Sequence, residues 1–276
     1  MYMTIPPILF NRAMLKFHRN RTNKNAWFIH DKAIVEIKER LSEIKRDFKK
    51  IAIIGFRAES WALDLNLDAT CINDDEIINF KENKYDLIIH AMGMHWSNDL
   101  LGQLIQMNRA LVPDGLIISI FFGGQTLSEL RVACAYAESA VSNGISPRIA
   151  PMGEIRDLGG LLQRAGLALP VADSMKFNVS YKTPINLMHD LRGMAETNII
   201  SNRKKTMMSK KLLNEISKQY FDNFSNSDGR IVATFELIFL TGWAPSSNQQ
   251  KPLMPGTAKV RLADALRTVE NKLEKD

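Results

Sequence analysis

Three short, mostly apolar runs recur between longer segments with helical spacing in the middle of this chain. They are Ile51–Ile54, Tyr85–Ala91 and Leu116–Phe122. Apolar runs of about four to eight residues are typical of buried parallel strands. Because helical segments alternate with them, the pattern predicts an open α/β sheet, in which ligands bind beyond the carboxyl ends of the strands.

The remaining elements are predicted from periodicity and from turn residues. Helices are expected over Phe10–Arg21, Asp31–Lys49, Asp99–Leu111, Leu127–Val141 and Ile155–Ala165, and strands at Cys71-Ile72, Lys176–Tyr181 and Arg230–Gly242. The apolar stripe predicted for the first helix is Phe10, Ala13, Met14 and Phe17. We expect both N-terminal helices to pack onto the body of the protein.

Composition narrows the class of protein. The chain has 276 residues, 45% of them hydrophobic and 24% charged, which excludes wholesale disorder. No apolar run approaches the roughly 20 residues of a membrane span. Two cysteines cannot form a disulfide framework and fit a reducing compartment. We expect a basic N-terminal helical segment over 1–49, a main domain over 50–256 with a helical insertion at about 185–224, and a C-terminal helix over 257–276.

Basic charge is concentrated at the N-terminus. Residues 1–50 hold 12 Lys/Arg and 5 Asp/Glu, whereas the remaining residues hold 24 and 25. A basic end can steer a protein to anionic lipid, nucleic acid or an acidic partner. A solvated helix face explains the same pattern. We expect no nucleic-acid partner, and we keep peripheral membrane contact by the first helix as an alternative.

An ordered series of motifs runs along most of the chain. It includes Met94-His95-Trp96-Ser97-Asn98-Asp99-Leu100, Phe122-Gly123-Gly124-Gln125, Ser146-Pro147-Arg148, Arg156-Asp157-Leu158-Gly159 and Thr241-Gly242-Trp243-Ala244-Pro245. The series resembles the class I S-adenosylmethionine (SAM)-dependent methyltransferases, and within them the mitochondrial complex I assembly factor 5 family of arginine hydroxylases and its proteobacterial relatives. A weaker likeness is to the malonyl-carrier-protein methyltransferase of biotin synthesis. The resemblance implies a Rossmann-like sheet and a SAM site.

The chain departs from that class at the loop after the first strand. The class pattern is Asp-x-Gly-x-Gly-x-Gly, whose glycines let the backbone approach the cofactor closely. Here the stretch reads Ile53-Ile54-Gly55-Phe56-Arg57-Ala58-Glu59. Only Gly55 remains, and Arg57 and Glu59 stand at the later glycine positions.

The segment after this loop is short as well. Family members place a helix, a second strand and another helix before the Tyr85–Ala91 strand, whereas Gly55 and Tyr85 lie only 30 positions apart here. One βαβ unit by itself needs about 30 residues or more. We therefore expect a methyltransferase sheet that lacks the second strand and an adjacent helix. For the acidic residue that ends the second strand in the family we find no convincing substitute, and Asp64 and Asp68 are the conceivable ones.

The resemblance implies four cofactor-binding residues: Gly55, Asp74, Ala91 and Met92. A lost hydrogen bond to a charged group costs about 1.5–3 kcal/mol, and steric blocking by Arg57 or Glu59 about 1–3 kcal/mol more. A micromolar site has only about 8 kcal/mol. We predict that SAM binding in the usual pose is weak or absent.

Six residues are expected on the substrate or partner side: His95, Trp96, Gly123, Gly124, Arg148 and Arg156. Each has a plainer interpretation, namely strand-end packing for His95-Trp96, a strand-to-helix turn for the glycines, and structural ion pairs for the arginines. His90 and His95 are five residues apart, but no cysteine or carboxylate cluster has the spacing of metal ligands, so no metal site is expected. No residue stands out as catalytic.

Two functions from different classes follow. The first is an assembly factor for respiratory NADH dehydrogenase with a degenerate SAM site, either non-catalytic or modifying an arginine on a subunit that it binds. The second is an active SAM-dependent methyltransferase acting on a carrier-protein thioester or a small acid. The resemblance implies a cytoplasmic protein in a bacterium or a mitochondrial-matrix protein in a eukaryote, with membrane-peripheral attachment as an option.

Overall fold

The computed structural model describes residues 8–142, 144–250, 256 and 260–269. The chain divides into two compact units, Met1–Pro245 and Ser246–Asp276, and each is described by itself. The second unit contains a short helix, α9 (Leu262–Leu266), with no buried residue. The C-terminal helix expected over 257–276 is therefore five residues long within the described range, and 257–259 and 270–276 lie outside it.

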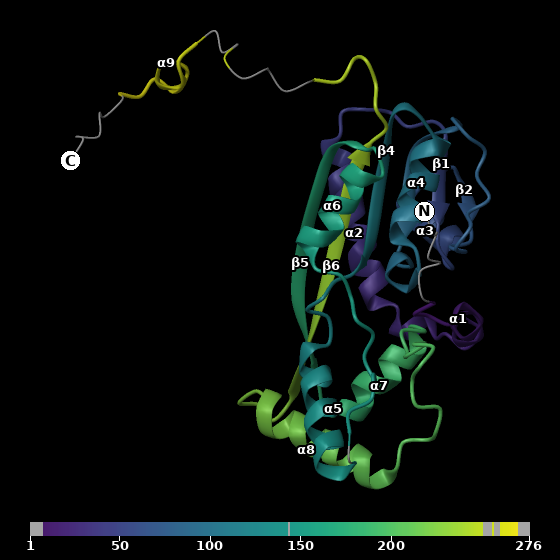
Figure 1. Cartoon of the computed structure of the whole chain (residues 1–276), viewed down its shortest axis with the longest axis vertical. Helices are drawn as coiled ribbons and strands as arrows, with labels where there is room; N and C mark the ends of the chain where they lie inside the picture. The colour runs from purple at the N-terminus through teal and green to yellow at the C-terminus, as the bar shows by residue number, and fades with distance from the viewer. Residues whose placement is uncertain (1–7, 143, 251–255, 257–259, 270–276) are drawn as a thin grey trace, which may run out of the picture. The chain divides into compact units, whose positions relative to one another are not determined.

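A mixed sheet forms the centre of the first unit (Figure 1). Its described strands lie in the order β2-β1-β3-β4-β6-β5. They are β1 (Ile51–Ile54), β2 (Ala69–Ile72), β3 (Tyr85–Ala91), β4 (Leu111–Phe122), β5 (Ala168–Tyr181) and β6 (Ile231–Trp243). Neighbouring strands are parallel except that β6 runs antiparallel to both β4 and β5. The predicted α/β sheet is confirmed.

Helices cover both faces of the sheet, which explains why β1 and β3 read as continuous apolar runs. On one face the buried core joins the sheet to α2 (Phe28–Glu43), α3 (Ala58–Leu65), α5 (Ser128–Val141), α7 (Pro184–Gly193) and α8 (Lys210–Phe224). On the other face it joins the sheet to α4 (Leu100–Ala110) and α6 (Ile155–Arg164). No helix in the described part of the chain combines the length and apolar character needed to cross a membrane.

The shortened segment between β1 and β3 holds one helix, α3, and one strand, β2. Strand β2 pairs directly with β1, in parallel, from Ile51 opposite Ala69 to Ile54 opposite Ile72. The segment is shortened as the spacing predicted, with no helix in the described residues between β2 and β3, but the predicted loss of the second strand was wrong. The strand that remains takes the place beside β1, so its end brings Asp74 to the same edge of the sheet as the loop after β1.

Strand β5 begins eight residues before the predicted start at Lys176. Its pairing with β6 shifts register between Ala168 and Val171, next to Pro170. An edge strand tolerates a proline and a bulge because one of its sides needs no ladder hydrogen bonds. Because of this proline, the sequence pattern did not predict the first part of β5. The predicted helix over Asp31–Lys49 also differs: α2 starts at Phe28 and ends at Glu43.

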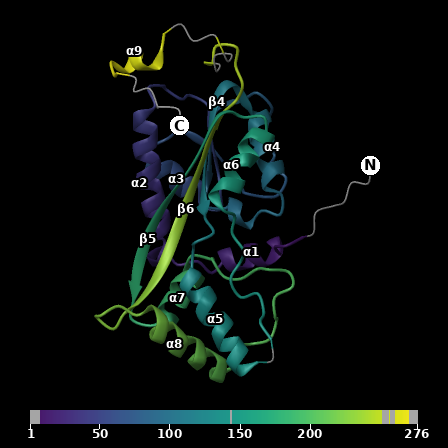
Figure 2. The ribbon, with the colours of Figure 1, turned by 60° about the vertical axis from the view of Figure 1, so that its left-hand side comes forward.

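The first helix, α1 (Arg12–Arg19), lies across the carboxyl end of the sheet beside α7, as Figures 1 and 2 show. It packs on the body as expected, and of the predicted stripe Phe10 is buried and Met14 packs against the core, whereas the other two residues were predicted wrongly. Ala13 is exposed and Phe17 is 45% exposed. The buried apolar residue within α1 is Leu15, and Arg12 and Arg19 flank it at helical spacing on the same inward face.

Candidate ligand-binding site

The loop after β1 keeps one feature of a cofactor loop. Gly55 approaches the end of β3 so closely that a Cβ on it would lie 2.7 Å from the Ala91 carbonyl oxygen. Only glycine fits this position. Ala91 and Met92 are both buried at that strand end, and Met92 adopts φ 53°. The structure therefore brings together three of the four residues expected to bind a cofactor.

Arg57, at a glycine position of the class loop, turns inward. It is 7% exposed, and its guanidinium carbon lies 3.5 Å from the centre of the Trp27 ring. Its Nη2 donates to the Ser60 hydroxyl at 3.1 Å. Burial lowers the pKa of Arg57 to about 10. A bulky cation thus fills the space beside the loop where the class has a bare glycine backbone.

Asp74, the fourth expected cofactor residue, is already engaged. It is 2% exposed, and Arg19 donates to both its carboxylate oxygens at 2.6 and 2.7 Å. Arg12 donates to the Asp74 carbonyl and lies 3.6 Å from its carboxylate. Burial favours the protonated acid, but the hydrogen bond and charge of Arg19 hold the pKa of Asp74 below its ordinary value.

The cofactor side of the sheet is therefore a cationic cavity of about 430 Å³ rather than a glycine-lined cradle. Its basic lining residues are Arg12, Lys16, Arg19 and Arg57. Helix α1 supplies three of these four cations. Its acidic lining residues are Asp74, which is paired with Arg19, and the exposed Asp75, and Gly55 is the one glycine of the class loop that is present.

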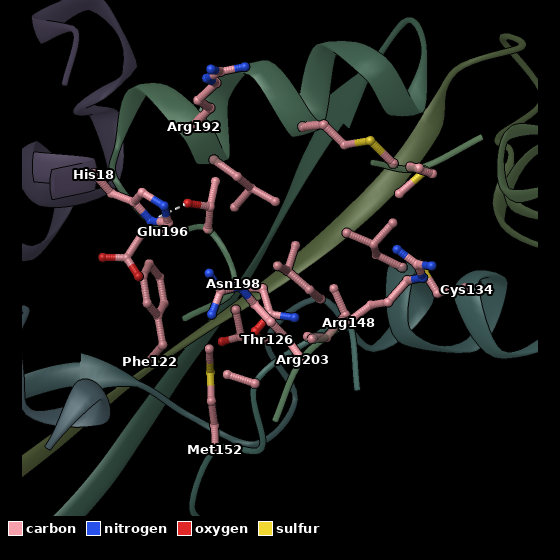
Figure 3. A pocket seen from close by; sticks show the side chains of 18 of the residues that line it. His18, Phe122, Thr126, Cys134, Arg148, Met152, Arg192, Glu196, Asn198 and Arg203 are labelled. Atoms are coloured by element: carbon pink, nitrogen blue, oxygen red, sulfur yellow. Dashed lines mark hydrogen bonds between the residues drawn. The ribbon is translucent and has the colours of Figure 1, made fainter. Parts of the chain in front are cut away.

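A larger cavity, of about 680 Å³, lies at the end of β4, where residues for a substrate or partner were expected (Figure 3). Its apolar wall comes from the end of β4, from β6 and from helices α5 and α7, and includes Phe122, Leu127, Leu130, Met152, Met188 and Phe235. Figure 3 shows Phe122 and Glu196 at one end and Cys134 and Arg148 at the other. Of the residues expected on this side, Trp96 and Arg148 line it.

Glu196 is the acidic residue that lines this cavity. One of its oxygens, Oε2, bonds to His95 Nε2 at 2.9 Å and accepts from Trp96 Nε1 at 2.8 Å. Among the described residues no hydrogen bond to its other oxygen, Oε1, is present. The His95 ring in turn packs edge-on against Phe122, with ring centres 5.1 Å apart. The expected pair His95-Trp96 thus positions a carboxylate toward the cavity.

Arg148 has a structural partner in addition to its place in the wall. Its Nε and Nη2 donate to Glu138 Oε1 at 2.8 and 2.6 Å. Ser146 donates to the same carboxylate through its backbone and its hydroxyl. Glu138 is 1% exposed, so this charge requires its partners.

Gly123 and Gly124 form the turn at the end of β4. A Cβ on Gly123 would lie 2.6 Å from the buried Glu236 carboxylate, and one on Gly124 would lie 2.3 Å from Glu154. Close packing against buried Glu236 and Ile238 therefore explains Gly123, whereas the atom near Gly124 is the end of the exposed Glu154 side chain, which can move aside. Arg156 is exposed on α6, and it is not among the residues that line the cavity.

Sequence reasoning missed Glu196 and the arginines of α1. Glu196 follows α7 in the predicted insertion, with no motif around it. The α1 arginines carried a signal, since they lie in a segment with no acidic residue before Asp31. A basic helix of this kind can form ion pairs with a buried carboxylate elsewhere in the fold.

The strand order, with its single reversed strand between β4 and β5, defines a class I methyltransferase-like fold. A solved loganic acid methyltransferase with SAH has this fold: its TM-score is 0.51 at 12% identity, covering 80% of this chain and 94% of that one. No protein-family model matches the chain.

Curated relatives are more specific. The chain is 38% identical over 200 residues to the mitochondrial arginine-hydroxylase NDUFAF5 of Danio rerio, covering 72% of this chain and 62% of that protein. A Rickettsia prowazekii protein provisionally named a methyltransferase is 30% identical over 56% of this chain and 68% of its own length. The chain belongs to a methyltransferase-like family together with the Rickettsia protein, and it is similar to the NDUFAF5 arginine-hydroxylases.

The weaker likeness expected from the sequence is also found. The malonyl-[acyl-carrier protein] O-methyltransferase of Halorhodospira halophila is 26% identical over 68% of this chain and 61% of that enzyme. The chain spans less than two thirds of the length of the NDUFAF5 proteins it matches, from 62% for the Danio rerio protein down to 44% for the Dictyostelium discoideum protein.

Proposed function

We propose that this chain is a methyltransferase-like assembly factor for respiratory NADH dehydrogenase that does not use SAM. In this proposal it binds an arginine-bearing segment of a subunit in the Glu196 cavity. The observation that carries the proposal is the contrast between the two sides of the sheet. On the cofactor side α1 pairs with Asp74, whereas on the substrate side a large cavity presents a carboxylate.

The shape and chemistry of the cavity support arginine as the bound residue. An arginine has a long apolar stem and a planar guanidinium that prefers carboxylates. The stem can lie along Phe122 and the neighbouring apolar wall, and the guanidinium can donate to the free oxygen of Glu196. The name of the NDUFAF5 relatives, arginine-hydroxylase, points to the same side chain.

The first experiment is calorimetric titration of the purified chain with SAM and with S-adenosylhomocysteine. We expect no detectable heat at about millimolar ligand, because the paired Asp74 and the buried Arg57 leave no usual binding pose. A Kd below about 100 μM, roughly −5.5 kcal/mol, would contradict the proposal. It would favour the alternative of an active methyltransferase on a carrier-protein thioester, which the Halorhodospira relative represents.

The partner is tested separately by capture. The tagged chain and its Glu196→Gln variant are mixed with purified peripheral-arm subunits of NADH dehydrogenase. We expect one subunit to bind the unaltered chain and to bind the variant at least about tenfold more weakly, since a charge-assisted hydrogen bond contributes about 1.5–3 kcal/mol. Equal capture by both proteins would remove the cavity from the proposal.

A further inference from the structure

A small cationic recess adjoins the Glu196 cavity. It has a volume of about 180 Å³ and is lined by His18, Arg21, Arg192 and Thr197. Three of these residues, His18, Arg192 and Thr197, also line the larger cavity. The two hollows therefore share a wall, and a ligand in one lies next to the other.

The recess holds charge that this part of the protein does not neutralise. Within the described residues, neither the Arg21 nor the Arg192 guanidinium takes part in an ion pair or a side-chain hydrogen bond, although Arg21 stacks on the Phe17 ring at 3.9 Å. The Nδ1 of His18 lies 2.7 Å from the Thr197 hydroxyl. No acidic residue lines the recess.

A third arginine adds to the same field. Arg203 lines the larger cavity together with Lys204. Burial lowers the pKa of His18, and the charges of Arg203, Arg21 and Arg192 lower it further. His18 lines the larger cavity together with Arg192 and Arg203, and it lines the recess together with Arg21 and Arg192, so cationic side chains surround it on both sides of the shared wall.

We infer that the recess binds a carboxylate of the same partner segment whose arginine enters the Glu196 cavity. The partner is then an arginine with an aspartate or glutamate close to it in sequence or space. This inference rests on the proposed function for the arginine, and it adds a second determinant. Arginine alone would be repelled by the cations of the adjoining recess, whereas a neighbouring carboxylate offsets that repulsion by pairing with Arg21 and Arg192.

The test compares three blocked heptapeptides by calorimetry against the full chain: Gly-Asp-Gly-Arg-Gly-Asp-Gly, the same peptide with both Asp replaced by Ser, and the first peptide with Arg replaced by Gln. We expect the acidic arginine peptide to bind at least about tenfold tighter than the serine peptide at low salt. The difference in affinity should shrink as salt is added, because Arg21 and Arg192 are exposed and salt screens their charge.

Two variants then locate the effect. Arg21→Gln with Arg192→Gln should abolish the preference for the acidic peptide: the acidic peptide should bind more weakly, and the serine peptide should bind as before or more tightly, because the repulsion of its arginine is removed. The control is Arg109→Gln with Arg164→Gln, which removes the same charge from exposed positions on α4 and α6. The control should leave the preference for the acidic peptide intact.

The outcomes separate the two proposals. Equal affinity for the acidic and serine peptides, or equal weakening of both peptides by the recess variant, would overturn the recess while leaving the arginine site intact. Equal affinity for the arginine and glutamine peptides would overturn the arginine site, and it would leave the recess as a carboxylate site only. Failure of all three peptides to bind at about millimolar concentration would overturn both.

Discussion

At the scale of single residues, two hydrogen bonds to one oxygen of Glu196 orient its carboxylate toward the cavity. Trp96 and His95 both bond to Oε2, which fixes the carboxylate and leaves Oε1 for a ligand. Glu196→Gln keeps the shape and one carbonyl acceptor but removes the charge. We expect the acidic arginine heptapeptide to bind this variant at least about tenfold more weakly, with a Tm within about 2 °C of the unaltered chain. Calorimetry and thermal unfolding measure the two quantities, and unchanged affinity would contradict the prediction.

His90 carries a second prediction at this scale, for stability against pH. It is fully buried, and burial lowers its pKa from 6.5 to about 4. Above about pH 6.5 the imidazole is neutral in both the folded and the unfolded chain. As the pH falls from 6.5 toward 4, the unfolded chain takes up a proton that the folded chain does not, so the free energy of unfolding decreases.

We expect urea denaturation to show this loss between pH 7 and pH 4.5, with at most about 1.4 kcal/mol per pH unit from one group. His90→Gln should flatten the slope. It should not abolish the slope, because burial also lowers the pKa of His30 well below its ordinary value. An identical slope in the variant and the unaltered chain would rule out His90 as the group responsible.

At the scale of elements, α1 links the N-terminal charge to the altered cofactor side. Its inward face pairs Arg19 with a buried aspartate, and breaking such a pair costs about 3–5 kcal/mol. We expect Arg19→Ala to destabilise the chain by an amount in this range and Arg19→Ala with Asp74→Asn to recover part of the loss. Urea denaturation of the two single variants and the double variant gives the coupling energy. Strictly additive effects would show that the pair contributes nothing.

The same helix shows where sequence reasoning succeeded and where it failed. The strands were predictable because burial on two faces makes β1, β3 and the later part of β4 continuous apolar runs. The orientation of α1 was not predictable from its apolar residues, because a partner 55 residues away in sequence, Asp74, outweighs the exposure of Phe17. An amphipathic pattern indicates which face of a helix is apolar, but an ion pair with a buried residue can decide which face of the helix packs inward.

The residues of the candidate site were likewise predicted only in part from the sequence. Gly55, Ala91 and Met92 were found because they lie next to strand ends, which periodicity locates well. Glu196 was not found, because it lies in an irregular segment after α7. Its contacts with His95 and Trp96, about 100 residues away in sequence, form only in the folded chain. Residues that act through long-range contacts carry no local signal, so the site was only partly accessible from sequence.

At the scale of the whole molecule, the first unit contains the full described core. Every residue of the three buried apolar clusters lies before Ser246. Hydrophobic burial is the main stabilising contribution to a fold. A unit that contains its whole core is therefore expected to fold without the rest of the chain.

Removing residues 246–276 tests this expectation. We expect the shortened chain to keep the secondary structure of the first unit, as measured by far-ultraviolet circular dichroism. Its Tm should lie within about 2 °C of that of the full chain, since a loss of about 1 kcal/mol shifts Tm by only roughly 2–4 °C at this size. The shortened chain should also bind the acidic arginine heptapeptide with unchanged affinity, because every residue of the cavity and the recess precedes residue 246. A fall in Tm of more than about 8 °C would show that the second unit contributes to the core, and lost peptide binding at unchanged Tm would place a binding determinant in it.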